Sequence, residues 1–249
     1  MIPISITKKQ IEILKLLFKF RFLNRYQIQT ILNHKDYRRI NAWLTDLTKK
    51  KLVNRIYSRT FGENTKPAIY YLRGKSRYFL KDSDSFSERI FRRVYREKGR
   101  TIGFIDHCLK VGDVFLRVTK SYSEKVYFYT KSELSNLSYM IHTAPDAYIA
   151  VGSTIAKRYF LDIFDPDIPR YEIRDRLEDY FEYAESKTWE SATNQVFPSV
   201  LYICPNDSIK KFVYREINKM KEDSPESINF FLTVLPIHHN TPISWQKVE

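Results

Sequence analysis

The basic residues of this 249-residue chain are concentrated in its first 100 residues. That part carries 25 Lys and Arg against 8 Asp and Glu, a net charge of +17, whereas residues 101–249 carry 17 against 21, a net charge of −4. Clustered cations release counterions when they meet nucleic-acid phosphates. The asymmetry therefore predicts two domains that meet near Gly99, the first of which binds nucleic acid.

The composition is that of a protein with sizeable cores. Hydrophobic residues make up 43% of the chain, aromatic residues make up 15%, and only six residues are glycine. Cys108 and Cys204 are far apart, and neither they nor the histidines show zinc spacing, which favours a reducing cytoplasm. The start "MIPISITKK" lacks a signal-peptide core, and no apolar run approaches the ~18 residues of a membrane helix. We expect a cytoplasmic protein without membrane contact.

Three segments of the first hundred residues have helical periodicity. Apolar residues recur at helical spacing from Lys8 to Phe20. The second segment has a helix start signal, because Asn24 suits the N-cap and Gln27 stands at the third helical position. A third helix is expected to begin near Asp36.

Two strands are expected after these helices, at Leu52–Ser58 and Ala68–Leu72. The polar stretch "FGENTK" (Phe61–Lys66) between them is typical of a turn. Three helices and a hairpin predict an α+β winged helix-turn-helix domain over residues 1–87. Arg59 and Lys66 on the wing would add contacts to the DNA backbone or the minor groove.

The third helix has two unlike faces. Its apolar residues fall within one arc at 100° per residue, the expected core face: Ile40, Trp43, Leu44 and Leu47. The other side and the end of the helix are polar and basic: Arg38, Arg39, Asn41, Thr45, Lys49 and Lys50. Arg and Asn make bidentate contacts with guanine and adenine edges, and Lys suits phosphates. We expect this helix to enter the major groove of double-stranded DNA; the alternative is a solvated face on a protein-binding domain.

A basic segment, residues 88–100, is predicted to form a linker helix. Helical geometry places four arginines on one of its sides: Arg89, Arg92, Arg93 and Arg96. The segment is either a second phosphate-contacting element, through Arg92 and Arg93, or an ordinary solvated helix.

Residues 101–249 read as an α/β domain. The expected elements are a helix, three strands, a helix, a strand, a helix and a last strand, with a hairpin through Gly152 and Ser153 between the second and third strands. The expected ranges are a helix over residues 101–122, strands at 125–130, 146–151 and 157–164, a helix at 171–187, a strand at 198–205, a helix at 207–220 and a strand at 228–237. The αβββαβ core order is that of the restriction-endonuclease-like fold.

In that fold the hairpin carries acidic residues, which here are Asp146 and Asp162. Two carboxylates can hold Mg²⁺ and cleave DNA if a base or a cation prepares the attacking water. Phe164 occupies the place where a nuclease would have its lysine, and the arginines of the next helix cannot act as bases near neutral pH. We therefore expect no catalytic residues and no cofactor; a nuclease would use Asp146 and Asp162 with Mg²⁺.

Several segments together resemble the replication-relaxation family of plasmids and other mobile elements. The resemblance covers about Ile11 to Leu235 and rests on the order and spacing of these segments: "IYYLRGKSRYFL", the helix with His107, Cys108 and Leu109, "PDAYIAV", "YFLDIF", "DRLEDYFEYAESKTWE" and "FPSVLYICP". Family members usually have an acid followed by "ExD" on the hairpin strand, where this chain has Asp162 to Asp165. They often have lysine on the next helix, where Arg176 stands here.

The resemblance implies a winged helix and a nuclease-like domain that is not known to cut. It also implies binding at a plasmid origin or transfer origin, in support of a relaxase or replication protein. The second domain, residues 101–249, would be free to bind such a partner or a second copy of the chain. A Mg²⁺-dependent endonuclease and a transcriptional repressor of a mobile-element operon are the alternatives. The aromatic residues Tyr180, Phe181, Tyr183 and Trp189 are expected in the core or on a dimer surface.

Overall fold

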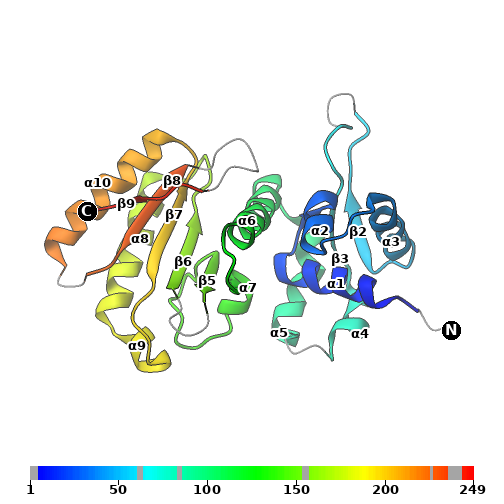
Figure 1. Cartoon of the computed structure of the whole chain (residues 1–249), viewed down its shortest axis with the longest axis horizontal. Coiled ribbons are helices and arrows are strands. Elements are labelled where there is room, and N and C mark those ends of the chain that lie inside the picture. The colour runs from blue at the N-terminus through cyan, green and yellow to red at the C-terminus, as the bar shows by residue number, and fades with distance from the viewer. Residues whose placement is uncertain (1–4, 61–63, 83–85, 153–156, 225–226, 235–242) are drawn as a thin grey trace. The chain divides into compact units, whose positions relative to one another are not determined.

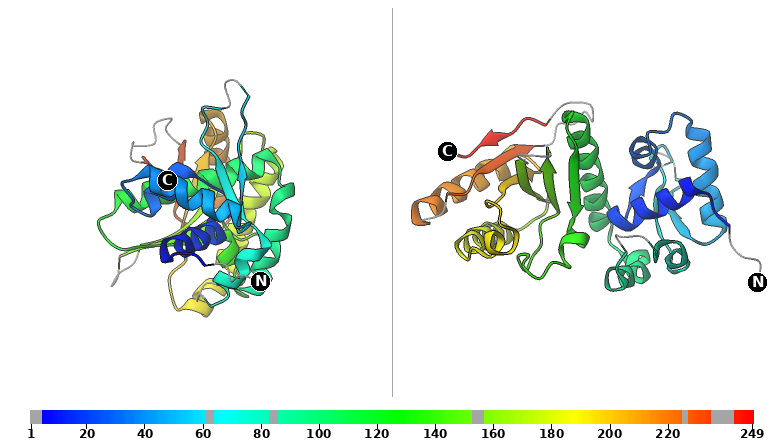
Figure 2. Two further views of the ribbon diagram at one scale, coloured as in Figure 1. Left: turned by 90° about the vertical axis from the view of Figure 1, so that its right-hand side faces the viewer. Right: turned by 60° about the horizontal axis from the view of Figure 1, so that its bottom comes forward.

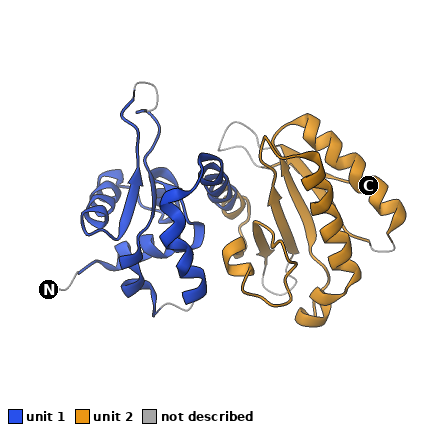
Figure 3. Ribbon diagram, turned by 180° about the vertical axis from the view of Figure 1, so that it is seen from behind, with its two compact units in different colours: residues 1–116 blue, residues 117–249 orange. Residues whose placement is uncertain are grey.

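A computed structural model describes residues 5–60, 64–82, 86–152, 157–224, 227–234 and 243–249 of the chain (Figure 1). The chain is a mixed α and β protein with two separate sheets. It divides into two compact units, residues 1–116 (unit 1) and residues 117–249 (unit 2), which Figure 3 colours separately.

Unit 1 begins with the three expected helices, each followed or preceded by short strands. The helices are α1 (Lys8–Phe20), α2 (Arg25–Ile31) and α3 (Tyr37–Lys49), and the strands are β1 (Leu23–Asn24), β2 (Val53–Ile56) and β3 (Ile69–Leu72). The strands pair antiparallel in the order β1-β3-β2. The two hairpin strands are shorter than the sequence predicted, and β1 was not predicted. Residues 61–63 of the expected turn lie outside the described part of the chain.

Side-chain caps fix where these helices begin. The Asn24 carboxamide accepts the backbone N–H of Gln27 at 3.0 Å, and the Gln27 side chain accepts the N–H of Asn24 at 3.0 Å. This reciprocal pair satisfies two N–H groups that the first turn of a helix leaves free, and it confirms the predicted start of α2. Asp36 caps α3 by accepting the N–H of Arg38 at 2.8 Å.

The core face of α3 differs from the prediction at one residue. Ile40, Leu44 and Leu47 are fully buried, as expected. Trp43 was also placed in the core, and this was wrong: it is half-buried, and its ring packs edge-on against His34 with the centroids 5.1 Å apart. Trp43 lies at the margin of the buried arc, where the indole is large enough to cover the neighbouring loop and still meet solvent.

The basic segment predicted as one linker helix has a different geometry. A single helical turn, α5 (Glu88–Phe91), continues into the 3₁₀-helix η2 (Arg92–Gly99). A 3₁₀-helix repeats every three residues rather than every 3.6, and the buried side chains follow that period: Phe91, Val94 and Glu97. The four arginines therefore do not share one side.

Glu97 attaches this segment to unit 1. Its carboxylate is 2% exposed and accepts two hydrogen bonds from Arg21, at 2.9 Å from Nε and at 3.0 Å from a terminal nitrogen. Arg21 ends α1 with a φ of 70°, a conformation that few residues other than glycine adopt without such support. The segment is thus part of unit 1 and does not form a free linker.

The helix α6 (Ile102–Ser121) explains why unit 1 extends beyond Gly99. Ile105 and Cys108 on its first half are buried with Phe22 and Tyr71 in one apolar cluster. The boundary between the compact units therefore lies within α6. Unit 1 also contains two short turns between β3 and α5, which are η1 (Gly74–Ser76) and α4 (Arg77–Leu80).

Unit 2 contains a six-stranded sheet in the order β4-β5-β6-β7-β8-β9. The strands are β4 (Val126–Thr130), β5 (Ala147–Val151), β6 (Lys157–Ile163), β7 (Ser199–Cys204), β8 (Phe230–Val234) and β9 (Gln246–Lys247), and the helices are α7 (Lys131–Leu134), α8 (Arg170–Glu185), α9 (Thr188–Thr193) and α10 (Asp207–Asp223). The first three strands pair antiparallel, and β6-β7 and β7-β8 are parallel. The predicted order of elements is confirmed; α7, α9 and β9 were not predicted. Ser153 and residues 235–237 of the expected last strand lie outside the described residues.

One face of this sheet carries the large aromatic core. Side chains of α8, α9 and α10 pack on Phe160, Tyr202 and Phe230 from the strands, and Figure 2 shows these helices along the sheet. The cluster predicted as core or dimer surface is core: Tyr180, Phe181, Tyr183 and Trp189 are all buried.

Candidate functional site

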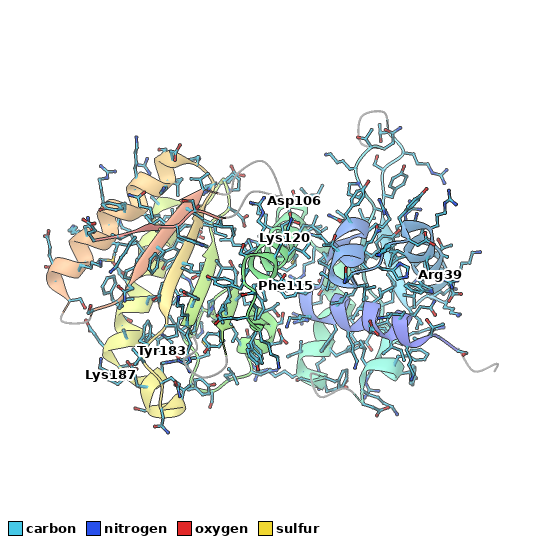
Figure 4. All side chains as sticks on the ribbon, in the orientation of Figure 1. Arg39, Asp106, Phe115, Lys120, Tyr183 and Lys187 are labelled. Atoms are coloured by element: carbon cyan, nitrogen blue, oxygen red, sulfur yellow. The ribbon has the colours of Figure 1, made fainter. Side chains whose placement is uncertain are left out.

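The outer side of α3 presents the predicted base- and phosphate-reading side chains to solvent. Its exposed members are Arg38, Arg39, Asn41, Thr45 and Lys49. Figure 4 labels Arg39 on this helix. Because Ile40, Leu44 and Leu47 occupy the opposite side, the exposed set is held in place by the core of unit 1.

The Lys50 side chain forms hydrogen bonds within unit 1. Its ammonium donates to the Asp46 carboxylate at 2.6 Å and to the backbone oxygen of Ser5 at 2.8 Å. The hydrogen bond from Lys50 lowers the pKa of Asp46, so the pair stays ionised at neutral pH. Of the two predicted phosphate-binding lysines, Lys49 is the one exposed on α3.

The remaining predicted residues fall into two groups. Arg59, Lys66 and Arg92 are exposed, the first two on either side of the β2–β3 loop. Arg93 is half-buried, donates to the backbone oxygen of Phe18, and lies over the Phe18 ring at 5.3 Å. The period of three in η2 turns Arg93 toward α1 and leaves Arg92 in solvent.

Sequence reasoning missed a set of stacked side chains beside α3. The Arg25 guanidinium lies 3.9 Å from the centroid of Tyr26 and 5.8 Å from that of Tyr37, and both rings are at least half exposed. Arg38 also lies 5.8 Å from Tyr37. The signal was an arginine next to a tyrosine at the start of both α2 and α3, which places cations and rings on neighbouring helix ends.

In unit 2 the structure brings the two candidate metal-binding acids together. Asp146 and Asp162 are both less than a tenth exposed. The backbone N–H of Asp146 donates to the Asp162 carboxylate at 3.2 Å, and the N–H of Ile163 donates to the Asp146 carboxylate at 2.9 Å. Each acid therefore binds the backbone of the other's strand, which fixes the β5–β6 register at this end.

Arg176 on α8 neutralises Asp162. Its guanidinium donates to both carboxylate oxygens, at 3.0 Å from Nε and at 2.9 Å from a terminal nitrogen, and it also donates to the backbone oxygen of Thr143. The Tyr180 hydroxyl, one turn further along α8, donates to the same carboxylate at 2.7 Å. The Asp162–Arg176–Tyr180 cluster is a buried, hydrogen-bonded ion pair.

Burial and charge keep this cluster in one protonation state. Burial, the largest single effect, would lower the pKa of Arg176. The charge and hydrogen bonds of Asp162, together with the neighbouring Tyr180 and Tyr202, outweigh burial, and the net pKa is raised. Burial raises the pKa of Tyr180 well above its usual value, and the Asp162 charge acts in the same direction. Arg176 therefore stays cationic, and Tyr180 keeps the proton that it donates to Asp162.

These residues do not fit a Mg²⁺ ion. Magnesium requires carboxylate oxygens that are free to enter an octahedral shell, whereas both oxygens of Asp162 are bound by Arg176 and Tyr180. Within the described residues, no three His, Cys, Asp or Glu side chains gather as a metal-binding group. Phe164, which the sequence analysis compared with the lysine of a nuclease, is buried and stacks on Tyr202 with the centroids 5.0 Å apart.

A sequence signal for the Asp162–Arg176 pair was present and was not used. The buried residues of α8 include Ile173, Leu177, Tyr180 and Ala184, and Arg176 lies on the same stripe. An arginine on an apolar stripe needs a buried acid, because an unpaired buried charge is strongly unfavourable. Arg174, which points off that stripe, instead pairs with Glu216 on the surface at 2.9 Å.

Comparison with known protein families identifies the family of this chain. The chain is a mixed α and β protein of two compact units. The sequence profile of the replication-relaxation family matches residues 14–200, more than half of the chain. The chain therefore belongs to the replication-relaxation family, and that membership suggests a role in the replication or transfer of plasmids or other mobile elements.

Other comparisons add little to the family. No curated protein is similar to the chain. The solved structure of the restriction endonuclease FokI is similar at 15% identity with a TM-score of 0.34, over 94% of this chain and 44% of that chain. The chain thus spans less than half the length of FokI. In the described residues, none of the helices has the length and apolar character needed to cross a bilayer.

Proposed function

We propose that unit 1 is a winged-helix domain that binds double-stranded DNA through α3. The DNA site is an origin of replication or transfer of the mobile element that carries the gene, in keeping with the replication-relaxation family. The order of the three helices and the β1-β3-β2 sheet supports the winged-helix assignment. The β2–β3 hairpin, whose connecting segment carries Arg59 and Lys66, forms the wing.

The observation that carries this proposal is the division of α3 into two faces. Ile40, Leu44 and Leu47 hold one side in the core, while Arg38 and Asn41 are exposed on the other. Arginine and asparagine are the side chains that read guanine and adenine edges in the major groove. Tyr37, stacked with Arg25 and Arg38, supports this surface from the start of the helix.

Loss of Arg38 should weaken binding to the preferred DNA site by about 1–3 kcal/mol and relax base preference there, because a bidentate base contact is lost. Lys49→Ala should weaken all duplexes alike and reduce the slope of log K against log salt by about one, because it removes a phosphate contact. The site is first selected from a random duplex library, and affinities of the full chain are then measured by fluorescence anisotropy over a salt series.

Arg215→Ala is the matched control. Arg215 is an exposed arginine on α10 of unit 2, so the variant loses the same charge away from α3. Duplex affinity and salt slope should both stay at the wild-type value. If Arg38→Ala and Lys49→Ala behave like Arg215→Ala, α3 is not the DNA-reading helix.

For unit 2 we propose a role in assembly without catalysis and without a metal cofactor. The occupied Asp162 carboxylate and the buried Phe164 support this role. The net charge of −4 over residues 101–249 favours a protein partner over DNA. We propose that this partner is a relaxase or replication protein, or a second copy of the chain.

Purified protein should leave supercoiled plasmid and single-stranded DNA intact in Mg²⁺ or Mn²⁺. Gel electrophoresis after prolonged incubation reads out nicking directly. Metal-dependent nicking that is lost in the nearly isosteric Asp162→Asn variant, assayed at a temperature at which circular dichroism shows the variant to be folded, would establish a nuclease in place of the proposed binding protein.

A further inference from the structure

A second basic surface of unit 1 lies away from the proposed wing and involves η2. In a 3₁₀-helix the side chains at i, i+3 and i+6 stand in a row, with a rise of about 6 Å per turn. Arg92, Tyr95 and Lys98 form such a row, and all three are exposed. Figure 1 shows the neighbouring α4 and α5 at the opposite end of unit 1 from the β2–β3 loop.

The Tyr95 ring is held in position while most of it faces solvent. Its side chain is 68% exposed, and one ring edge meets Phe91 in a T-shaped contact at 6.1 Å. The Tyr95 ring packs closely against Gly74, since a Cβ atom at that position would come within 2.7 Å of the ring. The glycine thus permits a close approach that no other residue allows without moving Tyr95.

A second exposed tyrosine and a cation accompany Tyr95. Tyr78 on α4 is 70% exposed. Arg77, the residue before Tyr78, forms an ion pair at 2.8 Å with Glu88 on α5, the turn that continues into η2. Gly74 and this ion pair therefore join the two segments of unit 1 that carry the exposed tyrosines.

The segments that carry Tyr78 and Tyr95 have a strongly positive charge. Among the described residues from Arg73 to Lys98, the exposed acids are Asp82 and Glu88. The exposed cations of the same stretch are Arg73, Lys75, Arg77, Lys81, Arg89, Arg92, Arg96 and Lys98. An anionic polymer is the ligand that this distribution attracts.

We propose that Tyr95 and Tyr78, with the cations around them, bind single-stranded DNA by stacking on unpaired bases. Proteins that bind single strands combine a cationic track for the backbone with aromatic faces for the bases. In duplex DNA the phosphates are accessible but the base faces stack on one another, so the exposed tyrosine rings cannot stack on them. An acidic protein surface would also pair with the cations, and competition by polyglutamate distinguishes it from single-stranded DNA.

The test uses the full chain and a fluorescent oligothymidylate, which cannot form a duplex. Tyr95→Ala should weaken binding about 10-fold, in the range of one lost base–aromatic stack, whereas Tyr95→Phe should bind like wild type because the ring remains. Gly74→Ala should weaken binding several-fold with every cation still present, because the added methyl group displaces the ring. Circular dichroism and melting temperature should be unchanged in all three, since the ring is exposed.

Two controls separate this surface from the proposed duplex site on α3. Tyr171→Ala removes a tyrosine of similar exposure (61%) from α8 and should leave oligothymidylate binding unchanged. Tyr95→Ala should leave duplex affinity unchanged, and Arg38→Ala should leave oligothymidylate affinity unchanged. These measurements can therefore disprove the single-strand surface without disproving the duplex site on α3, and the reverse.

Equal binding of oligothymidylate by wild type and Tyr95→Ala would overturn the proposal, even if Arg92→Ala and Arg96→Ala weaken it, because contacts would then be to the backbone alone. Displacement of oligothymidylate by polyglutamate at equal charge concentration would also overturn it, since stacking gives DNA an advantage that a carboxylate polymer lacks.

Discussion

Replacing Asp162 by alanine should destabilise unit 2 by about 3–5 kcal/mol, the usual effect of removing one partner from a buried ion pair. The Arg176 side chain, only 9% exposed, would keep its charge with no carboxylate beside it. The Tyr180 hydroxyl would lose its acceptor as well. Urea unfolding followed by tryptophan fluorescence measures the effect, because Trp189 lies in the core of the same unit.

Two variants provide the comparison. Arg174→Leu removes a neighbouring arginine of α8 whose ion pair is on the surface, and its effect should stay below about 1 kcal/mol. The double variant Asp162→Leu/Arg176→Leu should be more stable than Asp162→Ala, because it leaves no unpaired buried charge. If Asp162→Ala is as mild as Arg174→Leu, the ion pair does not hold the hairpin to α8.

A fragment that ends at Arg100 should fail to fold stably, whereas one that ends at Ser121 should fold. The shorter fragment lacks Ile105 and Cys108, so it uncovers Phe22 and Tyr71. Each large apolar side chain that returns to water contributes about 1.5–3 kcal/mol, and several together approach the whole stability of a small domain, about 5–15 kcal/mol. Circular dichroism melting curves of the two fragments show the difference directly.

The same assignment can be tested without truncating the chain at Arg100. Within the longer fragment, Ile105→Ala should cost about 2–4 kcal/mol, because it opens a cavity under Phe22. Ile102→Ala should change stability by less than about 0.5 kcal/mol, since Ile102 is 77% exposed on the same helix. Similar effects of the two variants would show that α6 is not part of the unit 1 core.

Sequence patterns predicted the parts of the fold that depend on near neighbours. The start of α2 follows from Asn24 and Gln27, three residues apart, and the two faces of α3 follow from its own periodicity. The alternation of strands and helices in unit 2 likewise predicted the order of its main elements.

Contacts between residues far apart in the sequence explain where the structure differs from the prediction. Residues 88–100 have an α-helical composition, yet Glu97 is drawn inward by Arg21, 76 positions earlier, and the segment adopts the period of three that buries it. The periodicity of α8 indicates that Arg176 is buried, but it does not identify Asp162 as the acid that Arg176 binds. That contact joins α8 to a strand and depends on how the helix packs across the sheet.

The Asp162–Arg176 pair also limits how this lineage can change. A chain with an open carboxylate pair keeps both acids and differs from this one at Arg176, and replacing Arg176 alone leaves the buried Asp162 charge without its cation. Such an intermediate loses about 3–5 kcal/mol out of the ~5–15 kcal/mol that keeps a domain folded. Selection for folding alone therefore opposes the loss of Arg176. Once Arg176 has been acquired, its loss destabilises the fold, so it is retained even where a carboxylate pair free to bind metal would be an advantage.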